Sequence, residues 1–215
     1  MTSRLETQAD LDAALALLID RDPRLASVLA VAKQAPLRRR AGGLGGLIQI
    51  VVGQQLSIAS AGAIWGRLSA AYEPFAADKI RRARPATLAR LGLSAAKIRT
   101  LKAIAAAIRD GLDLDALVEW PADQAHRTLT AVHGIGPWTA DIYLLFCLGH
   151  ADAFPAGDLA LQEAARLAFA LDERPAARAM AAIAEPWRPW RGVVAHLLWN
   201  YYRAVKRRDA VPLPL

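Results

Sequence analysis

The sequence predicts an all-α fold of about ten helices, on three observations. The 215 residues are 54% hydrophobic, enough to bury a core as one large or two small helical lobes. Alanine, leucine and arginine dominate and β-branched runs are short, a composition that favours helix throughout. Segments of helical periodicity follow one another, and no convincing strand, internal repeat or low-complexity tract separates them.

The first helices are marked by their start signals. Thr7 to Asp10 is typical of a helix start, and Asp22-Pro23 begins the second helix. Residues 36–46 form a basic, glycine-rich break, after which a buried helix is expected over 47–53 and another over 57–72. The inward positions expected in the first and last of these helices are Leu11, Leu15, Leu18, Ile19, Ala61, Ile64, Trp65 and Leu68.

The clearest amphipathic helix spans 94–109. One apolar stripe contains Ile98, Leu101, Ile104 and Ile108, while Lys97, Arg99, Lys102 and Arg109 lie mostly off it. Further helices are expected over 124–132, 138–148, 159–170, 175–183 and 192–205, and the tail 209–215, with two prolines, is expected to be loose.

A glycine-rich hairpin, His133-Gly134-Ile135-Gly136-Pro137, joins the helices expected over 124–132 and 138–148. Glycine adopts positive φ without a steric penalty, and proline suits the first position of the second helix. The amides exposed there form an electropositive cradle for a phosphate oxygen, which holds nucleic acid without reading its sequence. The alternative is a helix connection that only packs.

The charge favours a polyanionic partner, since the net charge is +7. A basic surface that only aids solubility is the alternative, and the clusters Arg81-Arg82-Arg84 and Lys206-Arg207-Arg208 are interpreted as solvated faces that could add to a phosphate-facing surface. Cys147 is the only cysteine, so no intramolecular disulfide and no cysteine-held iron–sulfur or zinc site is expected. No secretory signal or membrane-length apolar run is recognised, so a cytoplasmic location is expected, associated with the nucleoid in a bacterium.

Asp158 follows Trp138 by 20 residues and precedes another expected helix. Position alone favours a helix N-cap, because aspartate caps well and the helix dipole stabilises its charge. The functional interpretation is a carboxylate that stabilises an oxocarbenium-like transition state, as cleavage of a glycosidic bond requires. The two interpretations are compatible, because a cap would hold the side chain rigidly.

Aromatic residues and one polar loop complete the candidate site. Tryptophans are usually core residues, but several aromatics beside a DNA cradle and a carboxylate suggest a pocket that stacks a flipped, cationic base. The loop Gly53-Gln54-Gln55-Leu56-Ser57 is either an ordinary turn or a wedge that fills the gap left by that base.

These residues together resemble a family. The run from Leu129 to Ala140, followed by Asp158, resembles the helix–hairpin–helix-GPD DNA glycosylases, and more closely their 3-methyladenine DNA glycosylase II branch. The segments from Ile50 to Ser57 and from Trp187 to Gly192 are similar to the same branch. The resemblance covers roughly residues 5–208, and the N-terminal β domain of longer bacterial members is not recognised.

The resemblance implies a two-lobed helical fold with an active-site cleft between the lobes. One lobe would span 36–150 and contain the helix–hairpin–helix at about 124–148, while the other would join 1–35 to 151–215. Asp158 would be the catalytic carboxylate. Four further residues would lie at the base pocket: Trp138, Trp199, Tyr143 and Ile142, the last standing where some relatives have a tyrosine.

The remaining implied roles concern DNA and ions. Gly134 and Gly136 match phosphate-contacting amides, and Thr139, Gln54 and Gln55 are expected to contact DNA, with Gln55 at the position of the intercalating residue. Main-chain carbonyls of Thr130, Val132 and Ile135 match a site for Na⁺ or K⁺, and no other cofactor is implied. Trp138 occupies the position of the Schiff-base lysine of glycosylase/lyases, so no lyase activity is expected and water would be the nucleophile.

The function expected from these features is monofunctional hydrolysis of the N-glycosidic bond of alkylated purines in DNA, such as 3-methyladenine and 7-methylguanine. The product would be an abasic site, in base excision repair, and the partner double-stranded DNA with a flipped damaged base, bound by a monomer. Two alternatives stay open: a non-catalytic helix–hairpin–helix DNA-binding module, and a glycosylase for mismatched or oxidised bases.

Overall fold

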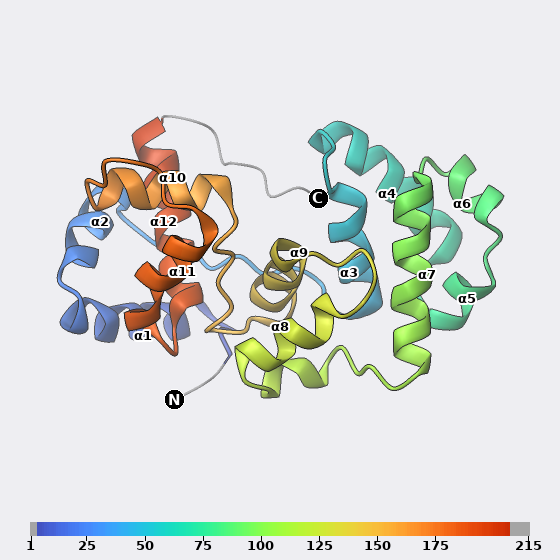
Figure 1. Cartoon of the computed structure of the whole chain (residues 1–215), viewed down its shortest axis with the longest axis horizontal. Helices are drawn as coiled ribbons and strands as arrows, with labels where there is room; N and C mark the ends of the chain where they lie inside the picture. Colours follow the sequence, from blue (N-terminus) through green and yellow to red (C-terminus); the bar gives the residue numbers. More distant parts are fainter. Residues whose placement is uncertain (1–3, 207–215) are drawn as a thin grey trace. The chain divides into compact units, whose positions relative to one another are not determined.

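The computed structural model describes residues 4–206, and it is built from helices (Figure 1). Within those residues no sheet forms, and one isolated bridge pairs Arg4 with His150. The all-α expectation is therefore confirmed. The tail 209–215, expected to be loose, lies outside the described residues.

The chain divides into two compact units. Of the described residues, unit 1 contains 4–39 and 144–206, and unit 2 contains 40–143. The sequence placed these divisions at 35/36 and 150/151. The second division falls earlier because residues 144–148 belong to a π-helical turn whose Phe146 packs on His196 of the last helix.

Unit 1 is organised around its last helix. Its elements are α1 (Gln8–Arg21), α2 (Arg24–Ala32), the π-helical turn η2 (Tyr143–Leu148) in which the chain enters the unit, α10 (Leu159–Ala168), α11 (Ala177–Ala184), the short 3₁₀ turn η3 (Glu185–Trp187) and α12 (Arg191–Lys206). Helix α12 packs against α1, α2 and α10, and its residues 191–200 are all buried.

Unit 2 is organised around α7. Its elements are α3 (Gly43–Gly53), α4 (Ile58–Tyr72), α5 (Ala77–Arg82), α6 (Pro85–Arg90), α7 (Ala95–Arg109), the 3₁₀ turn η1 (Ala116–Glu119), α8 (Ala122–Thr130) and α9 (Pro137–Ile142). Helix α7 packs against α3, α5 and α6 through the apolar stripe expected from the sequence.

Side-chain caps begin three of the helices where the sequence placed them. The Thr7 hydroxyl accepts a hydrogen bond from the Asp10 amide at 3.2 Å, and the Asp10 carboxylate accepts one from the Thr7 amide at 2.8 Å. Ser57 and Ser94 accept from the amides of Ser60 and Lys97 at 3.2 and 3.3 Å. Each cap satisfies an amide that the first helical turn leaves without a partner.

Other boundaries differ from the expectation. Helix α3 begins at Gly43 rather than at residue 47, and Gly45 lies so close to the Phe75 ring that a Cβ there would sit 3.1 Å from it. Helices α5 and α6 have six residues each, too short to show a periodic pattern. The helix expected over 138–148 changes to π geometry after Ile142. In the described part of the chain, no helix has the length and apolarity needed to cross a membrane.

His196 lies at the centre of the unit 1 core. It is completely buried on α12, and its ring meets the rings of Phe146 and Trp199 edge to face. Burial lowers the pKa of His196 from 6.5 to about 3, assisted by the positive charges of Arg38 and Arg39 and opposed by the Pro36 carbonyl. The native protein therefore holds this imidazole neutral, whereas the unfolded chain protonates it below about pH 6.5.

We expect the free energy of unfolding to fall as the pH is lowered from about 6.5 towards 3. The slope should approach about 1.4 kcal/mol per pH unit, because the unfolded state then binds one more proton than the native state. Urea unfolding of the wild type and of His196→Gln at several pH values measures this slope. The variant should show a flatter profile between about pH 6 and 4. An equally steep profile in both proteins would assign the acid sensitivity to other groups.

Candidate functional site

The hairpin is closed by its own backbone. The Ile135 amide donates to the Val132 carbonyl at 3.0 Å, and Gly134 adopts a φ of +84°. Pro137 then begins α9, with Gly136 as the N-cap residue. The positive φ explains why the turn needs glycine at position 134.

The two glycines of the hairpin have different surroundings. A Cβ on Gly134 would overlap the Thr100 hydroxyl of α7, so the hairpin lies directly against that helix. A Cβ on Gly136 would meet nothing within 4 Å, and its φ of −83° suits any residue. Gly134 therefore allows the hairpin to lie against α7, while Gly136 has open space where a side chain would be.

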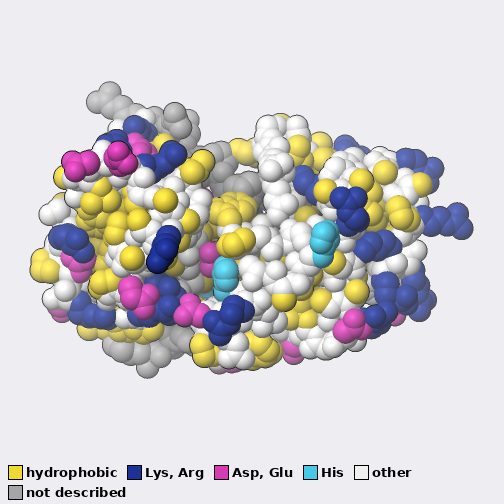
Figure 2. All heavy atoms as spheres, in the orientation of Figure 1, with side chains coloured by type: hydrophobic (Ala, Val, Ile, Leu, Met, Phe, Trp, Pro, Cys, Tyr) yellow, Lys and Arg dark blue, Asp and Glu magenta, His cyan; other side chains and the backbone are white. Residues whose placement is uncertain are grey.

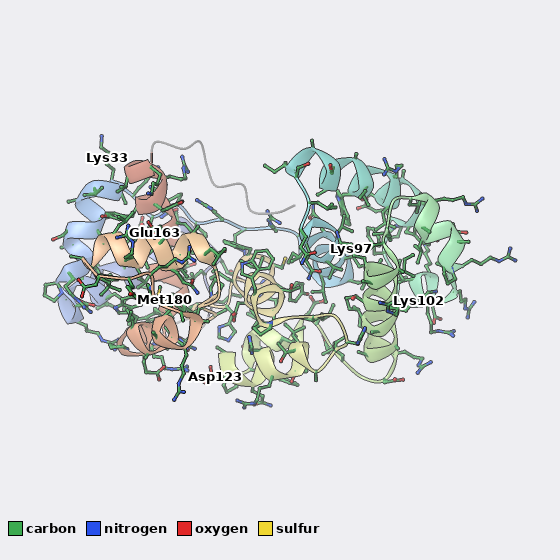
Figure 3. The ribbon with its side chains drawn as sticks, turned by 45° about the horizontal axis from the view of Figure 1, so that its top comes forward. Lys33, Lys97, Lys102, Asp123, Glu163 and Met180 are labelled. Carbon is green, nitrogen blue, oxygen red and sulfur yellow. The ribbon has the colours of Figure 1, made fainter. Side chains whose placement is uncertain are left out.

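The loop after α3 is tied to two other helices. The Lys97 ammonium of α7 donates to the carbonyls of Val52 and Gln54 at 2.7 and 2.9 Å, and burial lowers the pKa of Lys97 (Figure 3). The side-chain Nε2 of Gln54 donates to the Thr139 hydroxyl of α9 at 2.7 Å. The loop and the hairpin helix are therefore held together within unit 2.

The tip of this loop is exposed, and two exposed aliphatic residues follow Gln55. Gln55 has a φ of +57°, a left-handed conformation that costs free energy for a residue with a side chain. Leu56 and Ile58 are 37% and 44% exposed. The sequence suggested the loop over residues 53–57 as a possible wedge, with Gln55 at the intercalating position, and the structure shows that Leu56 and Ile58 are exposed after it.

Asp158 is the N-cap residue of α10, as its position in the sequence predicted. Its Oδ1 accepts hydrogen bonds from the Leu161 amide at 2.9 Å and from the Trp199 indole nitrogen at 3.1 Å. The loop before it is also braced, since the Gln162 amide group donates to the Ala156 carbonyl at 2.8 Å. The carboxylate is half-buried, with its direction set by α10 and α12 together.

A buried ion-pair network supports the segment that leads to Asp158. Asp152 accepts from the guanidinium of Arg191 at 2.9 Å through both oxygens, and from Arg188 at 2.7 Å. Gly192 donates to the Ala151 carbonyl at 2.8 Å, and a Cβ there would press on that oxygen and on Leu145. The segment from Trp187 to Gly192 thus anchors residues 151–153 to the start of α12.

The residues expected at a base pocket differ in exposure. Ile142 and Tyr143 are fully buried, and Trp199 is 2% exposed, so these three offer no open ring face in the structure. Trp138 is half-buried at the start of α9. Trp199 therefore acts first as a hydrogen-bond donor to Asp158, a role that position in the sequence could not indicate because 41 residues separate them.

The main-chain carbonyl oxygens of Thr130, Val132 and Ile135 are neutral oxygen ligands, the type of ligand that binds a monovalent cation. The turn bond from the Ile135 amide fixes the Val132 carbonyl and uses one of its two lone pairs. In the part of the chain that the structure describes, no cluster of His, Cys, Asp and Glu is arranged to hold a metal ion.

Sequence reasoning missed the contacts of Lys97 with the loop after α3 and the exposure of Ile58 beside that loop. Lys97 lies off the apolar stripe of α7, and such a lysine usually faces water. Lys97 is the third residue of α7, after the Ser94 cap, and this position is recognisable in the sequence. The α3 carbonyls that Lys97 binds come within reach only in the folded unit.

Comparison with known proteins identifies the relatives of this chain. Residues 48–189 match the family described as "HhH-GPD superfamily base excision DNA repair protein". A "Probable bifunctional transcriptional activator/DNA repair enzyme AlkA" of Mycobacterium tuberculosis is 32% identical over 213 residues, covering 93% of this chain. A "DNA-3-methyladenine glycosylase" of Bacillus subtilis is 27% identical over 165 residues, covering 70% of this chain. The chain spans 42% and 54% of the lengths of these two relatives.

A solved structure has the same fold. The DNA-3-methyladenine glycosidase of Bacillus halodurans superposes with a TM-score of 0.79 at 27% identity, covering 89% of this chain and 90% of that one. The resemblance noted in the sequence, including its alkylpurine branch, is confirmed by these matches.

The two hairpin glycines should respond differently to replacement by alanine. Gly134→Ala should lower the free energy of unfolding by about 2 kcal/mol or more, because it combines a positive φ with overlap at Thr100. Gly136→Ala should change it by about 1 kcal/mol or less, because its backbone conformation and surroundings accept a methyl group. Urea unfolding of both variants makes the comparison. Equal losses would contradict the close contact between the hairpin and α7.

Proposed function

Since the chain belongs to the HhH-GPD superfamily of base excision DNA repair proteins, we propose that it is a monofunctional DNA glycosylase acting on alkylated purines. The substrate class rests on relatives that carry the name DNA-3-methyladenine glycosylase, so 3-methyladenine and 7-methylguanine are the bases to test first. The observation that carries the chemistry is the Asp158 carboxylate, fixed by the Leu161 amide and the Trp199 indole.

Hydrolysis of the N-glycosidic bond places positive charge on the sugar. The bond from C1′ to the purine nitrogen breaks, and its electron pair leaves with the base, which departs neutral when alkylation had made it cationic. Asp158 stabilises the oxocarbenium-like sugar that remains. Water then adds its oxygen to C1′ and gives its proton to the carboxylate or to solvent, which leaves an abasic site.

No amine stands where a lyase would need one. Trp138 occupies the lysine position of the bifunctional relatives, so a Schiff base with the sugar cannot form there, and water is the nucleophile. The indole of Trp138 instead offers an aromatic face to a cationic base.

DNA is held through its backbone in this proposal. The main-chain N–H groups of Gly134 and Gly136 would bind a phosphate, and a monovalent cation bound by the carbonyls of Thr130, Val132 and Ile135 would add positive charge beside it. The loop with Gln55 and Leu56 enters the duplex where the damaged nucleotide has turned out. The partner is double-stranded DNA, bound by a monomer.

We expect Asp158→Asn to lose excision while keeping its fold. Asparagine still caps α10 and still accepts from Trp199, so the stability should change by about 1 kcal/mol or less. The amide carries no charge to stabilise the sugar cation, so the single-turnover release of 7-methylguanine from duplex DNA should slow at least about 100-fold. Affinity for an abasic duplex should persist.

Asp172→Asn is the matched control, because it removes the same charge from an exposed loop of unit 1. It should excise at the wild-type rate. If Asp158→Asn also excises at that rate, Asp158 is only a helix cap, and a non-catalytic DNA-binding module becomes the better assignment.

Trp199→Phe separates positioning of the carboxylate from stacking of a base. Phenylalanine keeps an aromatic ring against Phe146 and His196 but removes the indole donor to Asp158. We expect the single-turnover rate to fall about tenfold, because a less well fixed carboxylate stabilises the sugar cation less. Binding of an abasic duplex should stay unchanged. Weaker binding at an unchanged rate would instead indicate a stacking role.

A further inference from the structure

The positive charge of this protein is concentrated in one segment. Residues 67–109, from the second half of α4 to the end of α7, contain ten Lys and Arg against two acidic residues, a net of +8 in a chain whose total is +7. Residues 110–141, which include the hairpin, contain six acidic residues against one Arg. The hairpin can bind a phosphate through its amides, but the charge that attracts a polyanion lies on other helices.

Six of these cations are exposed side chains on or beside α5 and α6, and we call them the α5–α6 basic surface. They are Arg67, Lys79, Arg81, Arg82, Arg84 and Arg90. Figure 2 shows Lys and Arg side chains gathered over the end of unit 2 where Figure 1 places α5 and α6. Two acidic residues, Glu73 and Asp78, lie between Arg67 and Arg90, and Asp78 pairs with both Arg81 and Arg82, so most of the positive charge is uncompensated.

The surface is fixed to the same helix as the loop with Gln55. The Lys102 ammonium of α7 donates to the carbonyls of Ile80 at 2.8 Å, Arg81 at 2.6 Å and Ala83, which holds the end of α5. Lys97, five residues earlier, holds the end of α3 (Figure 3). At 1.5 Å per residue the two lysines are about 7.5 Å apart along α7. Loop and surface therefore belong to one rigid part of unit 2.

We propose that the α5–α6 basic surface binds the phosphates of double-stranded DNA that flanks the damaged nucleotide. The proposed function supplies the premise that a damaged nucleotide is bound near the hairpin and the loop with Gln55. The charge and position of the α5–α6 basic surface supply the argument that it binds phosphates. Arginine matches phosphate in charge and in its fork of donors, and B-DNA offers a phosphate about every 3.4 Å along each strand.

A consequence of this proposal is that the affinity for DNA depends on the length of the duplex. Within unit 2, α5 and α6 lie on the other side of α7 from α8 and α9 (Figure 1), so a duplex lying along the unit would meet this surface only beyond its first few base pairs. A duplex of about 10 base pairs with a central abasic site would engage the hairpin and the loop, whereas one of about 30 base pairs would also reach the surface.

The test compares two triple variants with the same loss of charge. One carries Arg82→Gln, Arg84→Gln and Arg90→Gln on the surface, and the control carries Lys33→Gln, Arg174→Gln and Arg178→Gln at exposed positions of unit 1. Affinities for the short and the long abasic duplex are measured at several salt concentrations.

On the long duplex, the surface variant should bind at least tenfold more weakly than the control near 0.1 M salt. The slope of log K against log salt should be about 2 to 3 units shallower, since each lost phosphate contact removes about 0.9. On the short duplex the two variants should be alike. Equal slopes on the long duplex would overturn the proposal, and an equal loss with double-stranded RNA of the same length would reassign the surface to any duplex polyanion.

A second measurement tests the proposed function independently of the surface. It is the rate of base excision from the short duplex when this duplex is saturated with protein. Both variants should release 7-methylguanine at the wild-type rate. A wild type that releases no base, together with a length-dependent loss in the surface variant, would reject the glycosylase assignment and retain the surface.

Discussion

The contact between Gly134 and Thr100 is the constraint on which unit 2 depends. A hairpin can lie this close to a helix only where it has no side chain, and its positive φ requires glycine for a second, independent reason. Lys97 and Lys102 lie on the same helix, three residues before and two after Thr100. Helix α7 therefore fixes the hairpin, the loop after α3 and the end of α5 through contacts made within about one and a half turns.

Unit 1 positions Asp158 in a different way, through buried charge at Asp152. Asp152 is compensated by two guanidinium groups, and removal of the buried Arg191 would leave the buried carboxylate with only the partly exposed Arg188 as an ion-pair partner. Such a network is geometrically demanding, because each carboxylate oxygen has its own donors. The seven residues from Asp152 to Asp158 thus start from a fixed point and end at a helix cap, so little freedom remains for the carboxylate that the proposed chemistry uses.

Local signals in the sequence predicted much of this structure. Thr7, Ser57, Ser94 and Asp158 were recognisable as caps because a cap is defined by the residues next to it. The hairpin was recognisable for the same reason. Its placement against α7 was not, because Thr100 is distant in sequence and nothing in its neighbourhood indicates a contact.

What the sequence left open depends on directions of side chains and on short elements. The indole of Trp199 could have faced a base or a carboxylate, and only the packing of α12 against α10 decides that it donates to Asp158. Helices α5 and α6 are too short for periodicity, so the arginines that they display looked like an ordinary solvated run. Folding turns that run into a surface, because Lys102 binds the carbonyls at the end of α5.

The shared oxygen of Asp158 has a consequence for how such a protein can diverge. The Asp158 Oδ1 atom accepts from the Leu161 amide in the first turn of α10 and from the Trp199 indole, 41 positions after Asp158. We therefore expect the effects of substitutions at Asp158 and Trp199 to be coupled. A lineage that replaced Trp199 would have to supply another donor at the same point before it could keep the carboxylate in place. We therefore expect substitutions at the two positions to be correlated among related proteins.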